Sequence, residues 1–152
     1  MRKTGRSYDG RTMSTDELSD RVAALRNAAI FAGLDEPSLR RVAAAMAEVE
    51  LPAGHVLIEP GQPGAGMFVI QEGTVSVHPR GADERSLGPG EIVGELALLT
   101  RDGTRTARVQ TTSAVRCFAL DRTSFREALE AEPKLAIALL ETAVERLASQ
   151  LP

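Results

Sequence analysis

Aromatic side chains are scarce in this chain of 152 residues, which has no tryptophan, one tyrosine and four phenylalanines. The chain therefore lacks the aromatic platform on which unpaired bases stack in single-strand nucleic-acid binders. Its formal charge of −3 also argues against non-specific attraction to a phosphate backbone. We expect no nucleic acid to bind through this chain, and we expect a core built from aliphatic side chains.

Cysteine and histidine are also rare, because the chain has only Cys117 and two histidines. One thiol cannot form an internal disulfide, and this set is too small for a structural zinc site. A reducing, cytoplasmic location fits, and we expect no metal and no cofactor. Cys117 lies among Val115, Phe118 and Leu120 in the sequence, which is typical of a small core residue.

Long hydrophobic runs are absent as well. The longest uncharged apolar run near the C-terminus, residues 135–140, is far shorter than the roughly 20 residues that span a bilayer. Residues 1–13 are basic but lack the apolar stretch of a signal peptide. We therefore expect no membrane span, a disordered leader over residues 1–13, and a single domain over residues 14–152.

The sequence pattern changes along the chain, from helical periodicity to short strand-like runs separated by glycines. We expect two amphipathic helices within residues 14–48, the first capped near Ser14 and the second opened by Asp35. The second helix should bury Leu39, Val42 and Met46 and leave Glu48 outside that face, and 10 of the 13 glycines follow between residues 54 and 103. Short runs rich in Val, Ile and Phe separate these glycines, which favours antiparallel strands. The expected strands are residues 56–58, 67–71, 74–78, 106–111 and 115–120.

Helical periodicity returns after residue 121, with one segment over 122–130 and a longer one over 133–151. The longer segment carries a heptad seam, which favours either packing on its own barrel or an intermolecular coiled coil. Because only two heptads are present, we expect the first. The seam consists of Ile137, Leu140, Val144, Leu147 and Leu151.

These elements predict an α+β fold. Helices over residues 14–48 precede an antiparallel β-roll, or jelly-roll-like barrel, over residues 49–121, and further helices fill residues 122–151. A short helix should interrupt the roll where the phosphate-binding pattern described next lies.

The residues that carry chemistry lie between positions 88 and 107. A Gly-Pro-Gly turn at 88–90 is followed by an expected short helix over 95–99, directly after Gly94. The free N–H groups at a helix start favour an anion such as phosphate. Arg105 follows at the start of the next strand, and a guanidinium can hold two phosphate oxygens. The carboxylate of Glu95 suits a neighbouring sugar hydroxyl, although an exposed ion pair between Glu95 and Arg105, worth under about 1 kcal/mol, is the simpler alternative.

Two stretches in this order resemble a known family. The run Gly94-Glu95-Leu96-Ala97-Leu98-Leu99, followed by Arg105-Thr106-Ala107, is similar to the phosphate-binding cassette of the cyclic nucleotide-binding domain family. Upstream, residues 61–75 resemble that family's signature turn, strand and glycine. Together they are far more specific than a lone glycine motif. The resemblance covers the chain from about residue 30 onward.

The resemblance implies a nucleotide held inside the roll, either cAMP or cGMP, and a sensor rather than an enzyme. By the family's pattern, Glu95 accepts from the ribose 2′-hydroxyl, Arg105 pairs with the cyclic phosphate, and the N–H groups of Leu96 and Ala97 contact phosphate oxygens. The C-terminal helix from Pro133 would be a mobile lid, and a homodimer could form through it. The effector is unknown.

The chain departs from the family's pattern at two positions. Many members have proline before the arginine, where this chain has Thr104, and Val93 replaces a frequent aromatic residue. Neither change removes a group that would bind the nucleotide, so they bear on the rigidity of the loop. Thr106 and Arg85 resemble positions that read guanine in some members. Guanine offers O6 and N7 acceptors to a guanidinium, whereas adenine presents a donor at C6, but cAMP stays open.

Two other functions compete with a free-standing sensor. A cupin-like jelly-roll metalloenzyme shares the strand pattern, but His55 and His78 are the only histidines, too few for its usual metal site. The second alternative is the receptor portion of a longer transcription regulator, kinase or channel, to which such domains are commonly attached.

Overall fold

The computed structural model describes residues 13–59, 61, 66–79, 81, 83–94 and 107–148. Two short helices come first, α1 (Thr15–Arg26) and α2 (Glu36–Ala45). Ser14 caps α1 by accepting the Glu17 N–H at 3.1 Å, and the Glu17 carboxylate accepts the Ser14 N–H at 2.8 Å. This reciprocal pair satisfies donors that a helix start leaves free. The capping position expected from the sequence is therefore confirmed.

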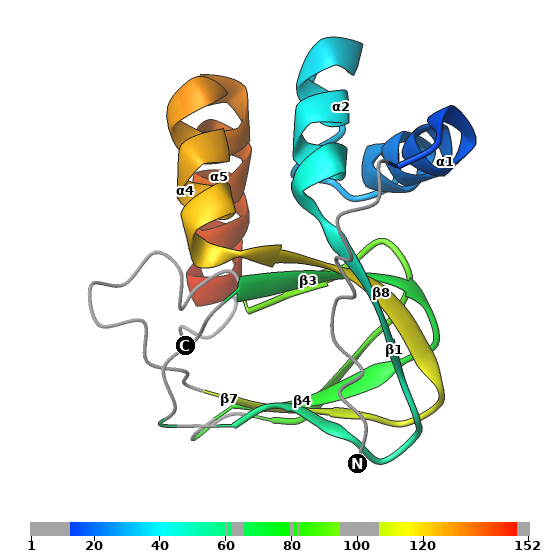
Figure 1. The fold of residues 1–152 in the computed structure, drawn as a ribbon. Coiled ribbons are helices and arrows are strands. Elements are labelled where there is room, and N and C mark those ends of the chain that lie inside the picture. The colour runs from blue at the N-terminus through cyan, green and yellow to red at the C-terminus, as the bar shows by residue number, and fades with distance from the viewer. Residues whose placement is uncertain are drawn as a thin grey trace.

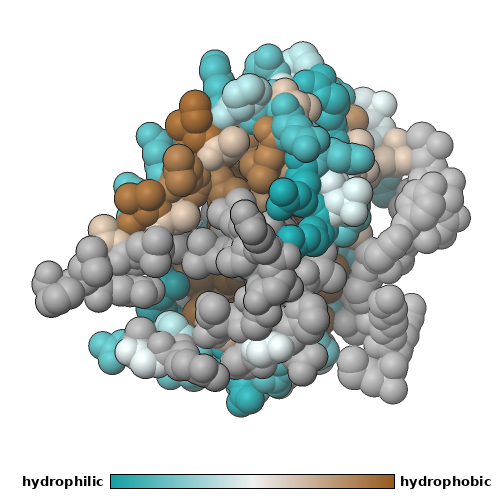
Figure 2. Space-filling model, turned by 90° about the vertical axis from the view of Figure 1, so that its left-hand side faces the viewer, coloured by the Kyte–Doolittle hydropathy of each residue, from teal (hydrophilic) through white to brown (hydrophobic). Residues whose placement is uncertain are grey.

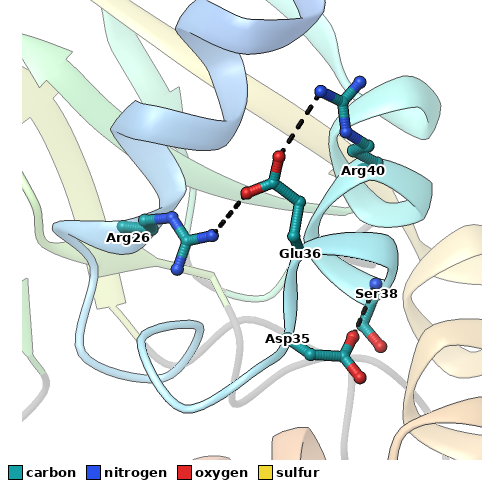
Figure 3. Close-up of polar contacts among 5 residues, drawn as sticks. All are labelled: Arg26, Asp35, Glu36, Ser38 and Arg40. Carbon is teal, nitrogen blue, oxygen red and sulfur yellow. Dashed lines mark hydrogen bonds and ion pairs between the residues drawn. The ribbon is translucent and has the colours of Figure 1, made fainter.

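The start of α2 is fixed by a cap and by ion pairs. Asp35 accepts the Ser38 N–H at 2.9 Å, and Glu36 pairs with Arg26 of α1 at 2.8 Å and with Arg40 one turn later at 3.4 Å (Figure 3). All three ion-paired side chains are well exposed, so these pairs contribute little to stability. The Glu36–Arg26 pair joins the start of α2 to the end of α1.

Eight strands form two antiparallel sheets of four in the described residues. The first sheet has the order β1-β8-β3-β6 and the second has the order β2-β7-β4-β5. The strands are β1 (Ala47–Leu51), β2 (Val56–Ile58), β3 (Gly66–Glu72), β4 (Val75–Pro79), β5 (Arg85–Leu87), β6 (Ile92–Val93), β7 (Ala107–Thr111) and β8 (Val115–Asp121). Figure 1 shows the two sheets facing each other and diverging toward the left of the view. The expected α+β fold with an antiparallel β-roll is confirmed.

The alternation along β8 divides the core into two layers. Val115 and Cys117 belong to a buried apolar cluster between the sheets, while Phe118 and Leu120 belong to a cluster on the helical side of the first sheet. This follows from the period of two in a strand, which sends successive side chains to opposite faces. Cys117 is fully buried, which confirms that it is a core residue.

Two helices end the described chain, α4 (Arg122–Ala131) and α5 (Pro133–Ala148). They lie with α2 above the first sheet, and the C-terminal end of α5 comes down beside the left end of β3 (Figure 1). Leu135 and Leu139 of α5 and Phe125 of α4 are buried in the helical-side cluster. Among the described residues, no helix is long and apolar enough to cross a membrane.

Two expectations about helices were wrong. The helix expected to reach residue 48 ends at Ala45, and Glu48 lies in β1, which pairs with β8 from Ala47 to Leu51. The local sequence is compatible with a helix, but hydrogen bonding to β8 decides for the strand. Leu39 and Val42 of the helix, and Met46 at its C-cap, are buried as expected.

The heptad seam of α5 was also assigned to the wrong side. The helix packs on the core through Leu135, Leu139 and Ala143, and the three seam residues whose side chains are described are exposed. Their exposed fractions are 57% for Ile137, 62% for Leu140 and 54% for Val144. The side chains of Leu147 and Leu151 lie outside the described residues. An apolar seam that is exposed in this way needs an explanation outside this chain's own core.

Candidate ligand-binding site

The expected phosphate-binding cassette joins the two sheets. Residues 95–106 leave β6, which is paired with β3 in the first sheet, and enter β7, which lies between β2 and β4 in the second. Glu95, Leu96, Ala97, Arg105 and Thr106 lie outside the described residues, as does the short helix expected over 95–99. The structure therefore defines the two ends of the cassette and the surfaces that face each other between them.

Gly94 stands at the first of these ends. Its φ of +90° lies in the left-handed region that favours glycine, because a side chain there is strained. The residue directly follows β6, where the pairing with β3 ends. The glycine that the sequence placed before Glu95 is thus required by backbone geometry.

Apolar side chains line the inner faces of both sheets near the two ends of the cassette. In the first sheet, Val93, Phe68 and Ala119 form one row across β6, β3 and β8. In the second sheet, Ala107 opens β7 and Leu57 lies on β2. Phe68, Ala119, Ala107 and Leu57 are only partly buried, although they pack against the cluster between the sheets. Figure 2, which views the diverging side, shows hydrophobic atoms set back between the helices and the second sheet.

These partly buried residues were missed by the sequence analysis as site residues. Alternation within the strands is the sequence signal that could have identified them. Phe68 lies two residues from Ile70, and Ala107 lies two residues from Val109, so each faces the cluster between the sheets with its neighbour. An apolar wall of this kind is what small-molecule sites offer to a flat ring, with a few polar groups to orient it.

Arg85 also lies on the inner face of the second sheet. It is paired with Val77 across β4 and β5, and Leu87, two residues on, is paired with Val75. Val75, Val77 and Leu87 all belong to the cluster between the sheets, and cross-strand partners share a face. Because β5 is an edge strand, the Arg85 side chain is exposed rather than buried. The sequence placed Arg85 in a strand correctly but could not say which way it faced.

The outer face of the second sheet carries a different set of polar contacts. Ser76 and His78 are 2.8 Å apart through Oγ and Nε2, and His78 Nδ1 lies 3.6 Å from Glu84. The order of serine, histidine and carboxylate is that of a nucleophilic triad. However, β4 lies between β5 and β7, so its N–H groups are used in the sheet rather than aimed at an oxyanion. We assign no catalytic role to these residues.

Other charged residues near the cassette also belong to the outer surface. Arg108 of β7 pairs with Glu59 at 3.1 Å, so its charge lies on the outer face of the strand. Burial raises the pKa of the Cys117 thiol to about 12, so this thiol stays protonated at neutral pH.

Among the described residues, no group of three or more His, Cys, Asp or Glu side chains could hold a metal ion.

Comparison with known proteins now defines the family. The family model of the cyclic nucleotide-binding domain matches residues 48–132. The chain is 29% identical over 128 residues to the CRP-like cAMP-activated global transcriptional regulator of Mycobacterium tuberculosis, covering 81% of this chain and 57% of that protein. The chain therefore belongs to the cyclic nucleotide-binding domain family, and the resemblance found in the sequence is confirmed.

Solved structures of this family have the same fold. The regulatory domain of Toxoplasma gondii PKA with cAMP matches at a TM-score of 0.67 and 31% identity, covering 76% of this chain and 46% of that chain. The N-terminal domain of a transcriptional regulator from Streptomyces coelicolor A3(2) matches at a TM-score of 0.65 and 34% identity, covering 86% of this chain and 92% of that chain. The chain thus spans little more than half the length of the mycobacterial regulator that it matches.

Proposed function

We propose that this chain is a sensor that binds a cyclic purine nucleotide between its two sheets and passes the binding event on through α5. The family match over residues 48–132 carries the proposal, because it includes both signature stretches. The partly buried apolar row at Phe68 and Ala119, beside the start of the cassette, supports it. The row supplies a wall for the purine or ribose, and the cassette supplies the polar groups.

The cassette residues receive their roles from the family's pattern. Glu95 accepts the ribose 2′-hydroxyl, Arg105 pairs with the cyclic phosphate, and the N–H groups of Leu96 and Ala97 contact phosphate oxygens. Thr106 adds its hydroxyl to the phosphate or the purine. The described structure supports this assignment at its two ends, where Gly94 has the backbone conformation that only glycine adopts easily and Ala107 starts an inner-face strand.

The base is adenine or guanine, and different observations favour each. The mycobacterial relative is named for activation by cAMP, and the Toxoplasma structure contains cAMP. The inner-face position of Arg85 favours guanine, since a guanidinium can donate to O6 and N7. We therefore propose that both nucleotides bind and that Arg85 and Thr106 decide the ratio.

Isothermal titration calorimetry tests this function directly. We expect saturable heats with cAMP, cGMP or both, and much weaker binding of linear 5′-AMP, which lacks the cyclic phosphate diester. A cyclic dinucleotide tests whether a larger ligand fits. Recovery of unchanged nucleotide by chromatography is the expected result for a protein that is not an enzyme. Absence of binding by all of these ligands at millimolar concentration would overturn the proposal.

The exposed seam of α5 favours a homodimer as part of the output. Ile137, Leu140 and Val144 follow heptad spacing and are more than half exposed, and Figure 2 shows hydrophobic atoms gathered over the helical part of this face. Paired copies would bury this seam. Sedimentation velocity at several concentrations should show a dimer that Leu140→Ser dissociates, while Glu141→Ser, its neighbour outside the seam, should not.

The match covers only part of the length of each relative, which favours a role for this domain within a longer regulator. It spans 57% of the mycobacterial transcription regulator and 46% of the kinase regulatory chain. We propose a cytoplasmic regulator of this general kind, in which the effector responds to the position of α5. Control of a reporter by cyclic nucleotide in the natural host, lost in the Arg105→Ala variant, is the expected result.

A further inference from the structure

The joint between α4 and α5 consists of one non-helical residue, Glu132. Its φ of −126° and ψ of 86° lie outside the helical region, and its N–H still donates to the Ala128 carbonyl at 2.9 Å. Its own carbonyl accepts the Leu135 N–H at 3.0 Å, which begins α5. The next residue, Pro133, has its φ fixed by the ring. A change in the angle between α4 and α5 must therefore be taken up largely by the torsions of Glu132.

The side chain of this joint residue is bound to a third helix. Glu132 forms an ion pair with Arg41 of α2, and the same Arg41 Nη2 donates to Ser38 Oγ at 3.1 Å. The exposed fraction is 14% for the Glu132 side chain and 3% for Ser38, whereas the Arg41 side chain is 63% exposed and reaches them from the surface. Hydrogen bonding by Ser38 and by Arg41 lowers the pKa of Glu132, so the carboxylate is charged at neutral pH. We call Ser38, Arg41 and Glu132 the joint cluster.

The joint cluster restricts the angle between the helices, which the apolar contacts alone restrict only weakly. Leu39 of α2, Phe125 of α4 and Leu135 of α5 lie in one buried cluster. Contacts between such side chains are largely non-directional, so they hold the helices together without fixing one angle strongly. A charge-assisted hydrogen bond from a guanidinium has a defined geometry. The joint cluster therefore selects one angle among those that the apolar contacts allow.

That angle decides where the far end of α5 lies. The helix of 16 residues is about 24 Å long at 1.5 Å per residue. A rotation of about 10° at the joint would thus move the last turn by roughly 4 Å, by the same helix geometry. In Figure 1 this end, in red, lies beside the left end of β3, on the side where the two sheets diverge.

We propose that Ser38 and Arg41 are positioning residues for the nucleotide site. Acting through Glu132, they hold α5 at the angle that brings its C-terminal end to the diverging side of the roll, and so they tighten nucleotide binding from the far side of the helical layer. The inference rests on the proposed function, because it requires a cyclic nucleotide to bind between the sheets and α5 to cover it.

A double-mutant cycle with a matched control tests this inference. Arg41→Gln and Glu132→Gln should each weaken cAMP binding by about three- to tenfold, because the population of the binding-competent angle falls. The double variant should lose no more than one single variant, since both break the same contact. Arg40→Gln removes the adjacent cation of α2, which pairs with Glu36, and should leave affinity unchanged. Affinities equal to that of the parent, or losses that multiply in the double variant, would overturn the inference.

Amide exchange without nucleotide separates this inference from the proposed function. Arg41→Gln should speed exchange over residues 135–143 of α5, and Arg40→Gln should not. If the parent binds no cyclic nucleotide, the proposed function fails, and unchanged exchange in α5 would independently refute the joint cluster. Should Arg41→Gln fold poorly, Glu132→Gln removes the other partner of the same ion pair, and it should show the same changes in exchange.

Discussion

Arg85 of β5 lies directly opposite Val77 of β4, and both therefore stand on the inner face of the second sheet. This register turns a charged residue of an edge strand toward the space where the purine is proposed to bind. We expect Arg85→Ala combined with Thr106→Ala to lower cGMP affinity more than cAMP affinity, by about 1–3 kcal/mol if both contacts form. Competition titration with both nucleotides measures the difference.

A matched control for the base prediction lies next to Arg85. Ser86 pairs with Ser76, whose side chain alternates away from the inward-facing Val75 and Val77, so Ser86→Ala should leave the preference between the nucleotides unchanged. Equal losses of cAMP and cGMP in the double variant, or no loss of either, would show that Arg85 and Thr106 do not read the base.

Arg105→Ala should remove most of the binding of both nucleotides, because it deletes a charge-assisted pair with the cyclic phosphate worth roughly 1.5–3 kcal/mol. Calorimetry measures the loss, and circular dichroism should show that the fold persists. Arg108→Ala is the control, since Arg108 lies in the same strand and pairs with Glu59 on the outer surface. Parental affinity in Arg105→Ala would mean that the phosphate lies elsewhere.

Glu95→Ala should weaken binding of cAMP and cGMP but matter much less for 2′-deoxy-cAMP. The reason is that the deoxy analogue has no 2′-hydroxyl to donate to the carboxylate, a hydrogen bond to a charged group worth roughly 1.5–3 kcal/mol. The measurement compares the affinity ratio of the two ligands in the parent and in the variant. The ribose assignment does not survive if both ligands lose the same factor.

Bound nucleotide should raise amide-exchange protection over residues 140–151, because a helix that covers an occupied site opens less often. Hydrogen-exchange mass spectrometry with and without cAMP tests this. The Arg105→Ala variant at the same nucleotide concentration is the control and should show no change. Protection confined to residues 94–107 would count against α5 as a lid.

The acid stability of the protein should depend on Glu132. Because Ser38 and Arg41 lower the pKa of this carboxyl below its usual value of 4.5, the charged form stabilises the folded state. That contribution is complete above the usual value and is lost as pH falls through the lowered one. Urea unfolding from pH 7 to pH 3 should therefore show Glu132→Gln less stable than the parent at neutral pH, with the difference shrinking in acid. Glu130→Gln, at an exposed site of α4, should show no such trend.

Local patterns in the sequence predicted much of the fold. Strand β2 has the expected bounds, and β3, β4, β7 and β8 agree with expectation to within one residue at each end. Asp35 and Ser14 start their helices as expected. These features depend on residues close in the sequence, namely a side-chain cap, a glycine turn or alternation along a strand, so they can be predicted without knowledge of the fold. The family resemblance rested on the same kind of local signal and was confirmed.

Contacts between distant segments decided the rest. The first two residues of β1 were taken as the end of a helix because the partner strand β8 lies about 70 residues later, and only the register from Ala47 to Leu51 shows the pairing.

The prediction that the heptad seam of α5 packs on the chain's own barrel was wrong for a related reason. Heptad spacing identifies an apolar face, but in the folded chain Leu135, Leu139 and Ala143 are buried, whereas Ile137 and Leu140 are exposed. Periodicity describes one helix, whereas burial depends on the angle at which it meets its neighbours.

The sequence by itself determined the family of this protein and predicts its binding chemistry, because the order of glycine, glutamate and arginine in the cassette is a local pattern that fits a cyclic phosphate and a ribose. Only the tertiary structure decided which side chains lie on the inner faces of the sheets and which distant helices contact each other. The pairing of Arg85 with Val77 turns a charge inward, and the contact of Arg41 with Glu132 joins residues 91 positions apart. Strand register and helix angles arise from packing across the whole chain, and no short stretch of sequence contains them.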